Sequence, residues 1–362
     1  MTILRIALLG SGYMGGTYAE CISKYNQRGR LVAVSGGRRA PGLAERYGIE
    51  YVEHYDALLA RNDVDAILIA TPHSLHLEQV VQAAAAGKHV LVEKPMGTTL
   101  EEAAEIVELA KKSPGHLVPA PHVILSPTYQ KMWRHIHRGD IGQPYLARAF
   151  YGWAGPSWGQ WFYRQGGGSM FDLGVYNVVS LTGFLGPAKR VTGLVGTAIP
   201  ERMVEGEMMK VEADDNAHIC IEFANSCYAV VTTGFTIQRY RTPAIEIYGS
   251  EGTIQMMGDD WDPDGYELWQ NEVGAWKVFD ESAPNWPWAD GINHLVECII
   301  EGKTPIITPA HAYHVIEIME AARAAGKDGQ RRDINSTFTP ATFWESEDEA
   351  VAAHLRHDTS SE

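Results

Sequence analysis

The sequence predicts an α/β fold in which a doubly wound parallel sheet is followed by a second, β-rich part. Three observations lead to this fold class. Short apolar runs alternate with amphipathic helical stretches over the first third of the chain. A Gly-Ser-Gly-Tyr-Met-Gly segment joins the first apolar run to the first helical stretch. Beyond Ile124, strand-like runs follow one another with few helices between them.

A glycine-containing turn joins the first strand, Leu4–Leu9, to a helical stretch over Tyr13–Gln27. Each glycine has a physical task here: Gly10 permits the sharp turn, Gly12 lets a pyrophosphate approach the backbone, and Gly15 lets helix and strand pack closely. The amides at the helix start would then face the anion. The turn therefore predicts a dinucleotide site, with a tight turn that binds nothing as the alternative.

The second strand, Leu31–Ser35, ends where dinucleotide folds contact the adenosine ribose. An NAD site usually has Asp or Glu there, about twenty residues after the glycines, to bond the 2′-hydroxyl. Here Gly36–Arg39 follows, and no acid precedes Glu45. A hydroxyl and two guanidinium groups would hold a 2′-phosphate, which a carboxylate would repel. The loop favours NADP over NAD, unless both arginines are simply solvated loop charges.

Alternating strands and helices complete the parallel sheet. The strands are Val64–Ala70, His89–Val92 and Leu117–Ala120, and the helices are Leu75–Ala86 and Leu100–Lys112. Functional side chains of such sheets gather at the carboxyl ends of the strands. Those ends carry Thr71-Pro72-His73, Glu93-Lys94-Pro95 and His122.

The second half reads mainly as strands. A helix over Thr128–Arg138 precedes strand candidates at Tyr145–Tyr151, Arg190–Ala198, His218–Ala224, Tyr228–Thr236, Ala244–Tyr248, Gly252–Met257 and Tyr266–Asn271. A glycine run, Gly166–Gly168, interrupts them and leads into a helix that ends near Phe184. Two late helices are expected over Gly291–Glu301 and Ala310–Ala325, and a polar, acidic tail follows Glu345.

Bulk properties narrow the class of protein. The chain has 362 residues and a net charge of −15, which argues against nucleic acid or an anionic membrane as partners. No apolar run approaches the length of a membrane span, and the N-terminus lacks the features of a signal peptide. The four cysteines show no CxxC spacing, so we expect reduced thiols in a cytoplasmic protein. The histidines form no metal-binding motif, and we expect no metal site.

Taken together, the motifs resemble the glucose–fructose oxidoreductase / inositol dehydrogenase / rhizopine-catabolism (Gfo/Idh/MocA) family. The segments that carry the resemblance are Gly10–Gly15, Thr71–His76, Glu93–Pro95, Ser126–Tyr129, Gly139–Pro144, Gly166–Gly168 and Asp172–Gly174. The resemblance implies a Rossmann domain over residues 1–122 and a substrate-binding α/β domain over 123–345, with a polar tail over 346–362. It also implies a large, open, mostly antiparallel sheet whose outer face forms a subunit interface, hence a homo-dimer or tetramer.

Family members mostly oxidise or reduce sugars, polyols and cyclitols with NAD or NADP and without metal. The resemblance therefore implies an oxidoreductase acting on CH–OH groups. Two alternatives stay open: a dinucleotide-binding sensor or regulator without catalysis, and a reductase of another small carbonyl or imine. The residues expected to bind the dinucleotide are Gly10, Gly12, Tyr13, Met14, Gly15, Ser35, Gly36, Gly37, Arg38, Arg39, Ala70, Thr71, Pro72, His73, His76, Glu93 and Lys94.

Three residues are expected to be catalytic. The resemblance matches Lys94 to the lysine that bonds the reacting oxygen and Asp172 to the acid beside the substrate, whereas Tyr176 stands where most members have histidine. Free tyrosine titrates near 10, so a neighbouring ammonium is needed to lower its pKa. Asp172 and Tyr176 are four apart on a predicted helix, hence on one face. The alternatives are a capping box between Ser169 and Asp172 and a core role for Tyr176, with His73 or His122 as the next proton carrier.

Aromatic residues crowd ahead of the glycine run and suit the apolar faces of a sugar ring. Packing against the sheet explains any one of them equally well. The residues expected to contact substrate are Lys94, His122, Trp153, Tyr163, Arg164, Asp172 and Tyr176, with His294 as a weaker candidate.

Overall fold

The computed structural model describes residues 2–346, so the predicted tail lies outside the described residues from 347 onward. The chain forms two compact units. Unit 1 consists of residues 1–122 together with Pro287–Ile316, and unit 2 consists of Val123–Trp286 and the residues from Glu317 onward. The segment Pro287–Ile316 therefore packs with the N-terminal residues, although it follows the β-rich region in the sequence.

Unit 1 is built on a six-stranded sheet of order β3-β2-β1-β4-β5-β6, in which every pair is parallel. This confirms the predicted doubly wound parallel sheet. Its strands are β1 (Leu4–Leu9), β2 (Gly29–Ser35), β3 (Glu50–Tyr51), β4 (Ala66–Ile69), β5 (His89–Val92) and β6 (Leu117–Pro119). The order turns back between β1 and β4, so the segments after these two strands lie side by side, as at the ligand site of open α/β sheets.

Helices cover both faces of this sheet. They are α1 (Tyr13–Tyr25), α2 (Ala40–Tyr47), α3 (Tyr55–Leu59), α4 (His76–Ala85), α5 (Leu100–Lys112) and α8 (Gly291–Glu301). The connections through α1 and through α4 move in opposite directions along the sheet, so right-handed crossovers place the two helices on opposite faces. α8 packs against α1, and α5 packs against α4. Because both faces are covered, every residue of β4 is buried.

Unit 2 contains a nine-stranded sheet of order β16-β15-β14-β13-β7-β12-β11-β8-β17, with only β12 and β7 running parallel. The large, mostly antiparallel sheet is thereby confirmed. Its strands are β7 (Pro144–Gly152), β8 (Ala188–Gly196), β11 (Asn216–Phe223), β12 (Tyr228–Gly234), β13 (Ile245–Gly249), β14 (Gly252–Asp259), β15 (Asp262–Gln270), β16 (Ala275–Asp280) and β17 (Arg332–Asp333). A separate hairpin pairs β9 (Glu201–Val204) with β10 (Glu207–Lys210).

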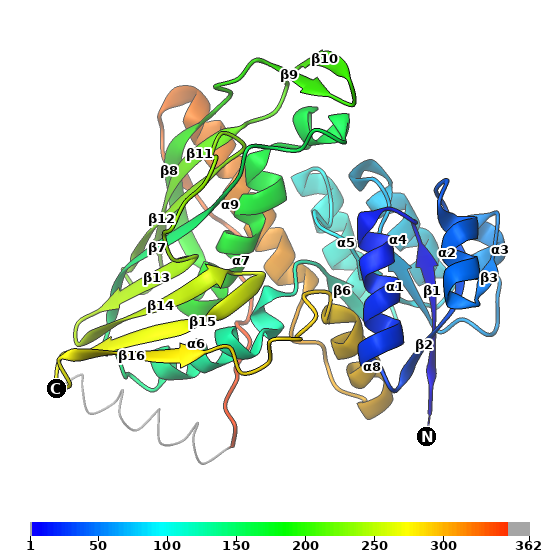
Figure 1. Ribbon diagram of the computed structural model, residues 1–362, viewed down its shortest axis with the longest axis horizontal. Helices are drawn as coiled ribbons and strands as arrows, with labels where there is room; N and C mark the ends of the chain where they lie inside the picture. Colours follow the sequence, from blue (N-terminus) through cyan, green and yellow to red (C-terminus); the bar gives the residue numbers. More distant parts are fainter. Residues whose placement is uncertain (1, 347–362) are drawn as a thin grey trace. The chain divides into compact units, whose positions relative to one another are not determined.

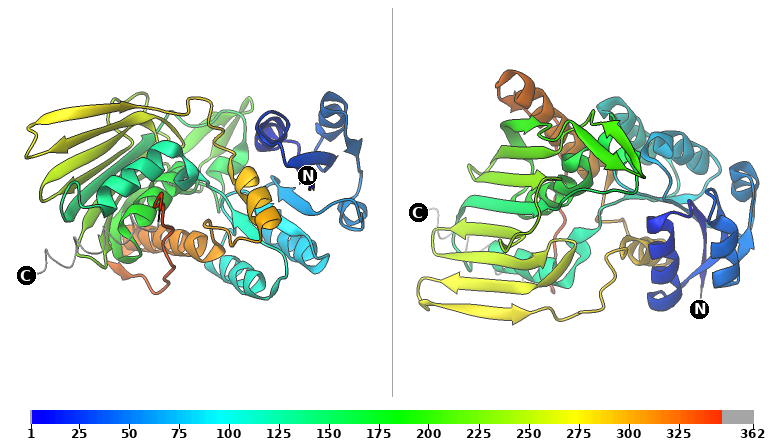
Figure 2. Two further views of the ribbon diagram at one scale, coloured as in Figure 1. Left: turned by 90° about the horizontal axis from the view of Figure 1, so that it is seen from below. Right: turned by 45° about the horizontal axis from the view of Figure 1, so that its top comes forward.

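Three helices lie along one face of the nine-stranded sheet: α6 (Pro127–His137), α7 (Val175–Leu185) and α9 (Pro309–Asp328) (Figures 1 and 2). No described helix covers the other face, along which Leu146, Tyr228 and Leu194 are exposed. Leu146 and Tyr228 are directly paired across β7 and β12. The alternation of buried and exposed residues along β11 and β12 reflects one packed and one open face.

The predicted elements are present with small shifts, and the structure adds five strands that sequence patterns did not indicate: β3, β9, β10, β16 and β17. Two of them contain only two residues, and most residues of the other three are not buried. Such strands carry no hydrophobic period, so only their pairing defines them.

Two further expectations concern the cysteines and membranes. All four cysteines lie in the described range and are free thiols, with Cys220 exposed and the other three buried. Among residues 2–346, no helix combines the length and the apolar character that crossing a bilayer requires.

Candidate active site

The glycine turn after β1 has the tight geometry that its sequence predicts. Gly10 has φ +109°, and a Cβ there would lie 2.3 Å from the carbonyl oxygen of Ala70, which follows β4. A Cβ on Gly15 would lie 2.2 Å from the carbonyl oxygen of Gly10. Around Gly12, by contrast, a Cβ would meet no atom within 4 Å. Gly10 and Gly15 are therefore required by packing, whereas Gly12 faces open space.

The start of α1 is suited to an anion. Gly12 is the N-cap residue, no side chain caps the helix, and its first turn contains no acid. The amides at this end consequently lack side-chain acceptors, and they carry the positive end of the helix dipole. A dinucleotide pyrophosphate fits both the open space at Gly12 and these donors. Tyr13 is 75% exposed beside them, with the Trp288 ring at 6.4 Å between centroids.

The residues after β2 that were predicted to contact the ribose differ in exposure and in role. Ser35 is buried, and its carbonyl accepts the Gly10 amide at 2.8 Å, so its role is in the backbone of the turn. Gly36 and Gly37 both have positive φ, and the hydroxyl of Ser11 donates to the Gly36 carbonyl at 2.9 Å. Arg38 and Arg39 follow and are exposed. Within residues 2–346 neither arginine forms an ion pair, so both guanidinium groups are available to a phosphate.

His76 joins the segments after β4 and β5. Its Nδ1 lies 2.8 Å from the carbonyl oxygen of Pro95 and its Nε2 lies 3.0 Å from that of Thr71. The ring is fully buried, and burial lowers its pKa. His76 thus connects these two segments from a buried position. The ring of His73 lies 5.7 Å away, and burial lowers the pKa of His73 to about 3, so this histidine is a weak proton acceptor.

Glu93 anchors the Glu93-Lys94-Pro95 segment at the end of β5. The hydroxyl of Tyr18 in α1 donates to Oε1 of Glu93 at 2.7 Å, and the amide of Lys94 donates to Oε2 at 3.1 Å. Burial raises the pKa of Glu93, and these two contacts oppose the shift. Lys94 itself is half-buried. Since Glu93 is buried and engaged, it supports the position of Lys94 rather than presenting its own carboxylate.

His122 lies in the interior of unit 1. It is 3% exposed, and a Cβ on Gly291 of α8 would lie 2.2 Å from its ring. Burial lowers its pKa to about 3. A proton carrier needs a pKa near the working pH and a path to substrate. The structure therefore argues against His122 as substrate contact or proton carrier. His294, the weaker candidate, accepts the amide of Ile306 at 3.1 Å.

In unit 2, one turn of π-helix over Met170–Gly174, here called the π-turn, leads into α7. It carries Asp172, and Tyr176 lies in the first turn of α7; both side chains are half-buried. The alternative of a capping box is wrong, because the Ser169 hydroxyl and amide both donate to Asp214 instead. The helix predicted here exists, but its beginning is wider than an α-helix.

A group of residues that sequence patterns missed surrounds this position. Tyr151 is the penultimate residue of β7, and its ring lies 6.0 Å from that of Tyr176 in an edge-to-face arrangement. Burial raises the pKa of Tyr151, and the carboxylates of Asp259, Asp172 and Asp260 raise it further. Because β7 and β14 run in the same direction, their carboxyl ends meet at one edge of the sheet. Applying the strand-end rule to this second sheet would have found Tyr151 and Asp259.

Two of these carboxylates differ in environment. Asp259 is half-buried and accepts the Tyr240 hydroxyl at 2.6 Å. Asp260 is 1% exposed, accepts from Asn177 at 3.0 Å and from Ser180 at 3.3 Å, and leaves Oδ1 without a hydrogen-bond partner in the described chain. Burial raises its pKa to about 7. Asp260 is thus partly protonated at neutral pH, beneath the start of α7.

The aromatic segment before the glycine run is divided: Phe162 and Tyr163 lie in the core, whereas Trp158 and Trp161 are exposed. Tyr163 is 1% exposed, and its hydroxyl donates to the carbonyl of Pro156 at 2.8 Å, so its expected contact with substrate is corrected to a packing role. Phe162 belongs to the same core, and Trp153 is partly buried against it. Arg164 is exposed and donates to Gln160 at 2.9 Å. Of the two aromatic residues of this segment that were expected to contact substrate, Trp153 stays a candidate for ring stacking, because it is neither fully buried nor turned to solvent.

Comparison with known proteins bears on the fold and the chemistry. Residues 4–119 match the family described as "Oxidoreductase family, NAD-binding Rossmann fold", and residues 129–255 match the "GFO/IDH/MocA C-terminal domain". The scyllo-inositol 2-dehydrogenase (NAD(+)) of Bacillus subtilis is 26% identical over 345 residues, which cover 93% of this chain and 98% of that protein. Levoglucosan dehydrogenase of Pseudarthrobacter phenanthrenivorans is 26% identical over 287 residues, which cover 70% and 73%.

Solved structures agree with this fold. Levoglucosan dehydrogenase in complex with NADH and L-sorbose has a TM-score of 0.83 at 22% identity, and the match covers 93% of this chain and 100% of that one. GenD2 from gentamicin A biosynthesis, in complex with NAD, has a TM-score of 0.77 at 25% identity, with 93% and 97% covered.

Proposed function

The chain belongs to the Gfo/Idh/MocA family and is an NAD(P)-dependent oxidoreductase acting on CH–OH groups, and from this premise we propose a mechanism, a cofactor preference and a substrate class. The proposed reaction interconverts a hydroxyl and a carbonyl on a sugar, polyol or cyclitol, with Tyr176, Lys94 and Asp172 as the catalytic residues. The observation that carries it is the half-buried pair Asp172 and Tyr176 on the π-turn and the first turn of α7.

Each proposed catalytic residue has one task. Tyr176 takes the proton of the reacting hydroxyl in oxidation and returns it in reduction. The ammonium of Lys94 favours the anionic form of the reacting oxygen and lowers the proton affinity of Tyr176. Asp172 accepts a hydrogen bond from a neighbouring hydroxyl and orients the ring. Bound NAD(P) supplies the hydride acceptor or donor.

NADP is the proposed cofactor. The support is the loop after β2, where Arg38 and Arg39 are exposed and no acid stands at the ribose position. Two guanidinium groups favour a 2′-phosphate over a hydroxyl. The two structural neighbours described above are complexes with NADH and with NAD, so the preference proposed here would distinguish this chain from those two.

The proposed substrate is uncharged or positively charged. The carboxylates of Asp259 and Asp172, and Asp260 to the extent that it is ionised, act on Tyr151 beside Tyr176, and a substrate anion there would be repelled. Neutral polyhydroxylated rings offer hydroxyl donors to the same oxygens, and aromatic rings such as Tyr151 suit their apolar faces. Sugar acids and phosphorylated sugars are accordingly expected to be poor substrates.

The decisive experiment uses Tyr176→Phe, which keeps the ring and removes the hydroxyl. Turnover should fall by roughly 10²–10⁴-fold while NADPH affinity and the melting temperature stay at wild-type values. Tyr240→Phe is the matched control, because it removes a tyrosine hydroxyl of the same unit that donates to Asp259. Turnover is first located on a panel of neutral sugars, cyclitols, amino sugars and sugar acids. Wild-type turnover in Tyr176→Phe would contradict the assignment.

A further inference from the structure

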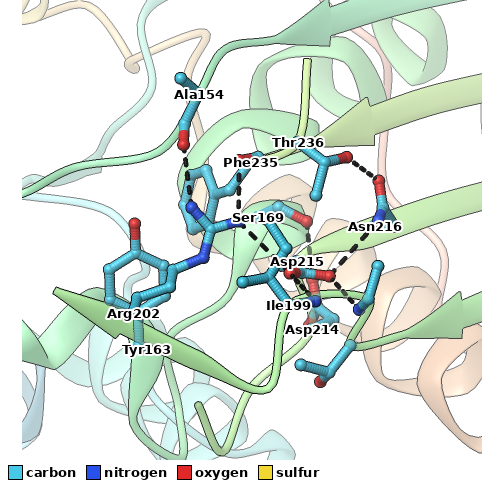
Figure 3. A network of polar contacts seen from close by, with 12 residues as sticks. Ala154, Tyr163, Ser169, Ile199, Arg202, Asp214, Asp215, Asn216, Phe235 and Thr236 are labelled. Atoms are coloured by element: carbon cyan, nitrogen blue, oxygen red, sulfur yellow. Dashed lines mark hydrogen bonds and ion pairs between the residues drawn. The ribbon is translucent and has the colours of Figure 1, made fainter. Parts of the chain in front are cut away.

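Two adjacent buried aspartates, Asp214 and Asp215, stand directly before β11 and bind in different directions (Figure 3). Asp215 accepts the amides of Ala198 at 2.6 Å and Ile199 at 2.9 Å, and Arg202 at 3.3 Å. These contacts hold the segment that leads into the β9–β10 hairpin. Asp214 instead binds the glycine run and the beginning of the π-turn, which the proposed mechanism uses.

Asp214 sets where the π-turn begins. Its Oδ2 accepts the Ser169 hydroxyl at 3.0 Å and the Met170 amide at 2.9 Å. The Met170 amide belongs to the first residue of the π-turn, a position whose amide has no acceptor within the helix. With that donor bound, the helix starts at one defined residue. A start displaced by one residue would rotate every following side chain by about 100°.

Arg323 of α9 binds the other carboxylate oxygen of Asp214. Its Nε and Nη2 donate to Oδ1 of Asp214 at 2.9 and 2.6 Å, and Nη2 also donates to the carbonyl of Gly167. The guanidinium carbon lies 4.2 Å from the centroid of the Phe171 ring. One guanidinium group therefore holds the aspartate, the glycine run and an aromatic residue of the π-turn together.

The backbone at Gly168 packs tightly against this ion pair. Its φ is +103°, and a Cβ there would lie 2.5 Å from Oδ1 of Asp214 and 2.8 Å from Nη2 of Arg323. The ion pair is largely buried, with side-chain exposures of 18% for Arg323 and 4% for Asp214. A buried ion pair resists rearrangement, because separating its members leaves an unpaired buried charge.

We propose that Arg323 and Asp214 are positioning residues for catalysis: their ion pair fixes the beginning of the π-turn and thereby the orientation of Asp172 and Tyr176. The inference rests on the proposed roles of these two residues. According to this inference, Arg323 influences turnover without contacting substrate. It does so although it lies 109 residues after Asp214 in the sequence, on a different helix from the catalytic residues.

The test compares Arg323→Lys, Tyr176→Phe and the double variant. Arg323→Lys keeps the charge but loses the planar fork that reaches both Asp214 and Gly167. We expect kcat to fall by roughly 10–100-fold, as for a displaced catalytic group, with the Kd for NADPH within about twofold of wild type. The double variant should lose clearly less than the product of the two single losses, since the share of the Arg323→Lys loss that acts through the Tyr176 hydroxyl is already gone and only the share that acts through Asp172 remains.

Arg190→Lys is the matched control, because Arg190 also forms two ion pairs in unit 2, with Glu222 and Asp333, but contacts neither the glycine run nor the π-turn. If Arg323→Lys does not fold, Ser169→Ala replaces it, since this variant removes a single hydrogen bond to Asp214 and should lower kcat by roughly two- to tenfold.

The outcomes are distinguishable. Wild-type kcat in the folded Arg323→Lys or Ser169→Ala protein, with only the melting temperature lowered, would reduce the ion pair to a stabilising contact and overturn the inference. Multiplied losses in the double variant would overturn it as well, while Tyr176 kept its role. Wild-type turnover in Tyr176→Phe would overturn the proposed mechanism and this inference together.

Discussion

A methyl group added at Gly12 should separate cofactor binding from folding. Gly12 has φ −73° and ψ −164°, which alanine adopts freely, and a Cβ there meets no atom within 4 Å. The Gly12→Ala protein should therefore fold with an unchanged melting temperature. The same methyl group would occupy the space that the pyrophosphate needs. Overpacking of this kind costs about 1–3 kcal/mol, which corresponds to a loss of affinity of roughly 5- to 150-fold.

Two other glycines of α1 provide the controls. Gly16→Ala also places its Cβ in open space, but at a helical position after the turn, so NADPH should bind normally and stability should rise by about 0.5–1 kcal/mol. Gly15→Ala would set its Cβ 2.2 Å from the Gly10 carbonyl oxygen and should damage folding itself. Calorimetric titration with NADPH and thermal unfolding of the apo proteins measure both quantities. Equal affinities of Gly12→Ala and Gly16→Ala would refute the reasoning.

Three further predictions concern cofactor choice, pH and assembly. Arg38→Ala should reduce the preference for NADP over NAD in binding titrations. Substitution of Arg30, an exposed arginine on β2, by alanine should not change it. Equal affinities of the wild-type protein for NADP and NAD would refute the preference. Because burial raises the pKa of Asp260 to about 7, the folded state holds a proton that the unfolded chain releases above about pH 4, and stability falls as pH rises between these values. Asp260→Asn should thus stabilise by up to roughly 4 kcal/mol at pH 8 and by little at pH 4, as denaturant unfolding would measure; an equal gain at both pH values would contradict this. Wild-type protein should sediment as a dimer or tetramer at micromolar concentration. Tyr228→Lys, on the open sheet face, should dissociate the oligomer, whereas the control Ile3→Lys should not. A monomeric wild-type protein would refute the predicted assembly.

Local patterns predicted most elements of unit 1, but not α2, β3 and α3, and the predicted ones were found because their causes are local. The bounds of β1, β5 and α5 are those expected from apolar runs and helical periodicity. At the start of α5 the Thr99 hydroxyl accepts the Glu102 amide at 3.2 Å, a contact within one helical turn. The edge strand β16 escaped prediction because most of its residues are exposed and show no alternation.

The residues of the candidate site also fall into those that local patterns predicted and those that depend on distant parts of the chain. Gly15 could be assigned from sequence because the carbonyl that crowds it, that of Gly10, belongs to the same turn, and Gly10 because its place in this motif recurs, although the Ala70 carbonyl that crowds it comes from a distant part of the chain. Tyr163 was misjudged because aromatic composition does not distinguish a core ring from a ring that lines a site, and only its 1% exposure does. The environment of Tyr151 was missed because the acids that act on it come from other strands and from the π-turn.

The sequence alone determined the fold class, the family and the glycine turn, since periodicity, turn chemistry and motif spacing depend on residues close in the chain. Tertiary structure alone decided which polar groups are buried and what they bind. Asp214 meets Arg323 across 109 residues, and Asp260 acquires its raised pKa only where the sheet and α7 remove it from water. Such properties depend on desolvation and on distances between elements, and no local pattern in the sequence encodes either.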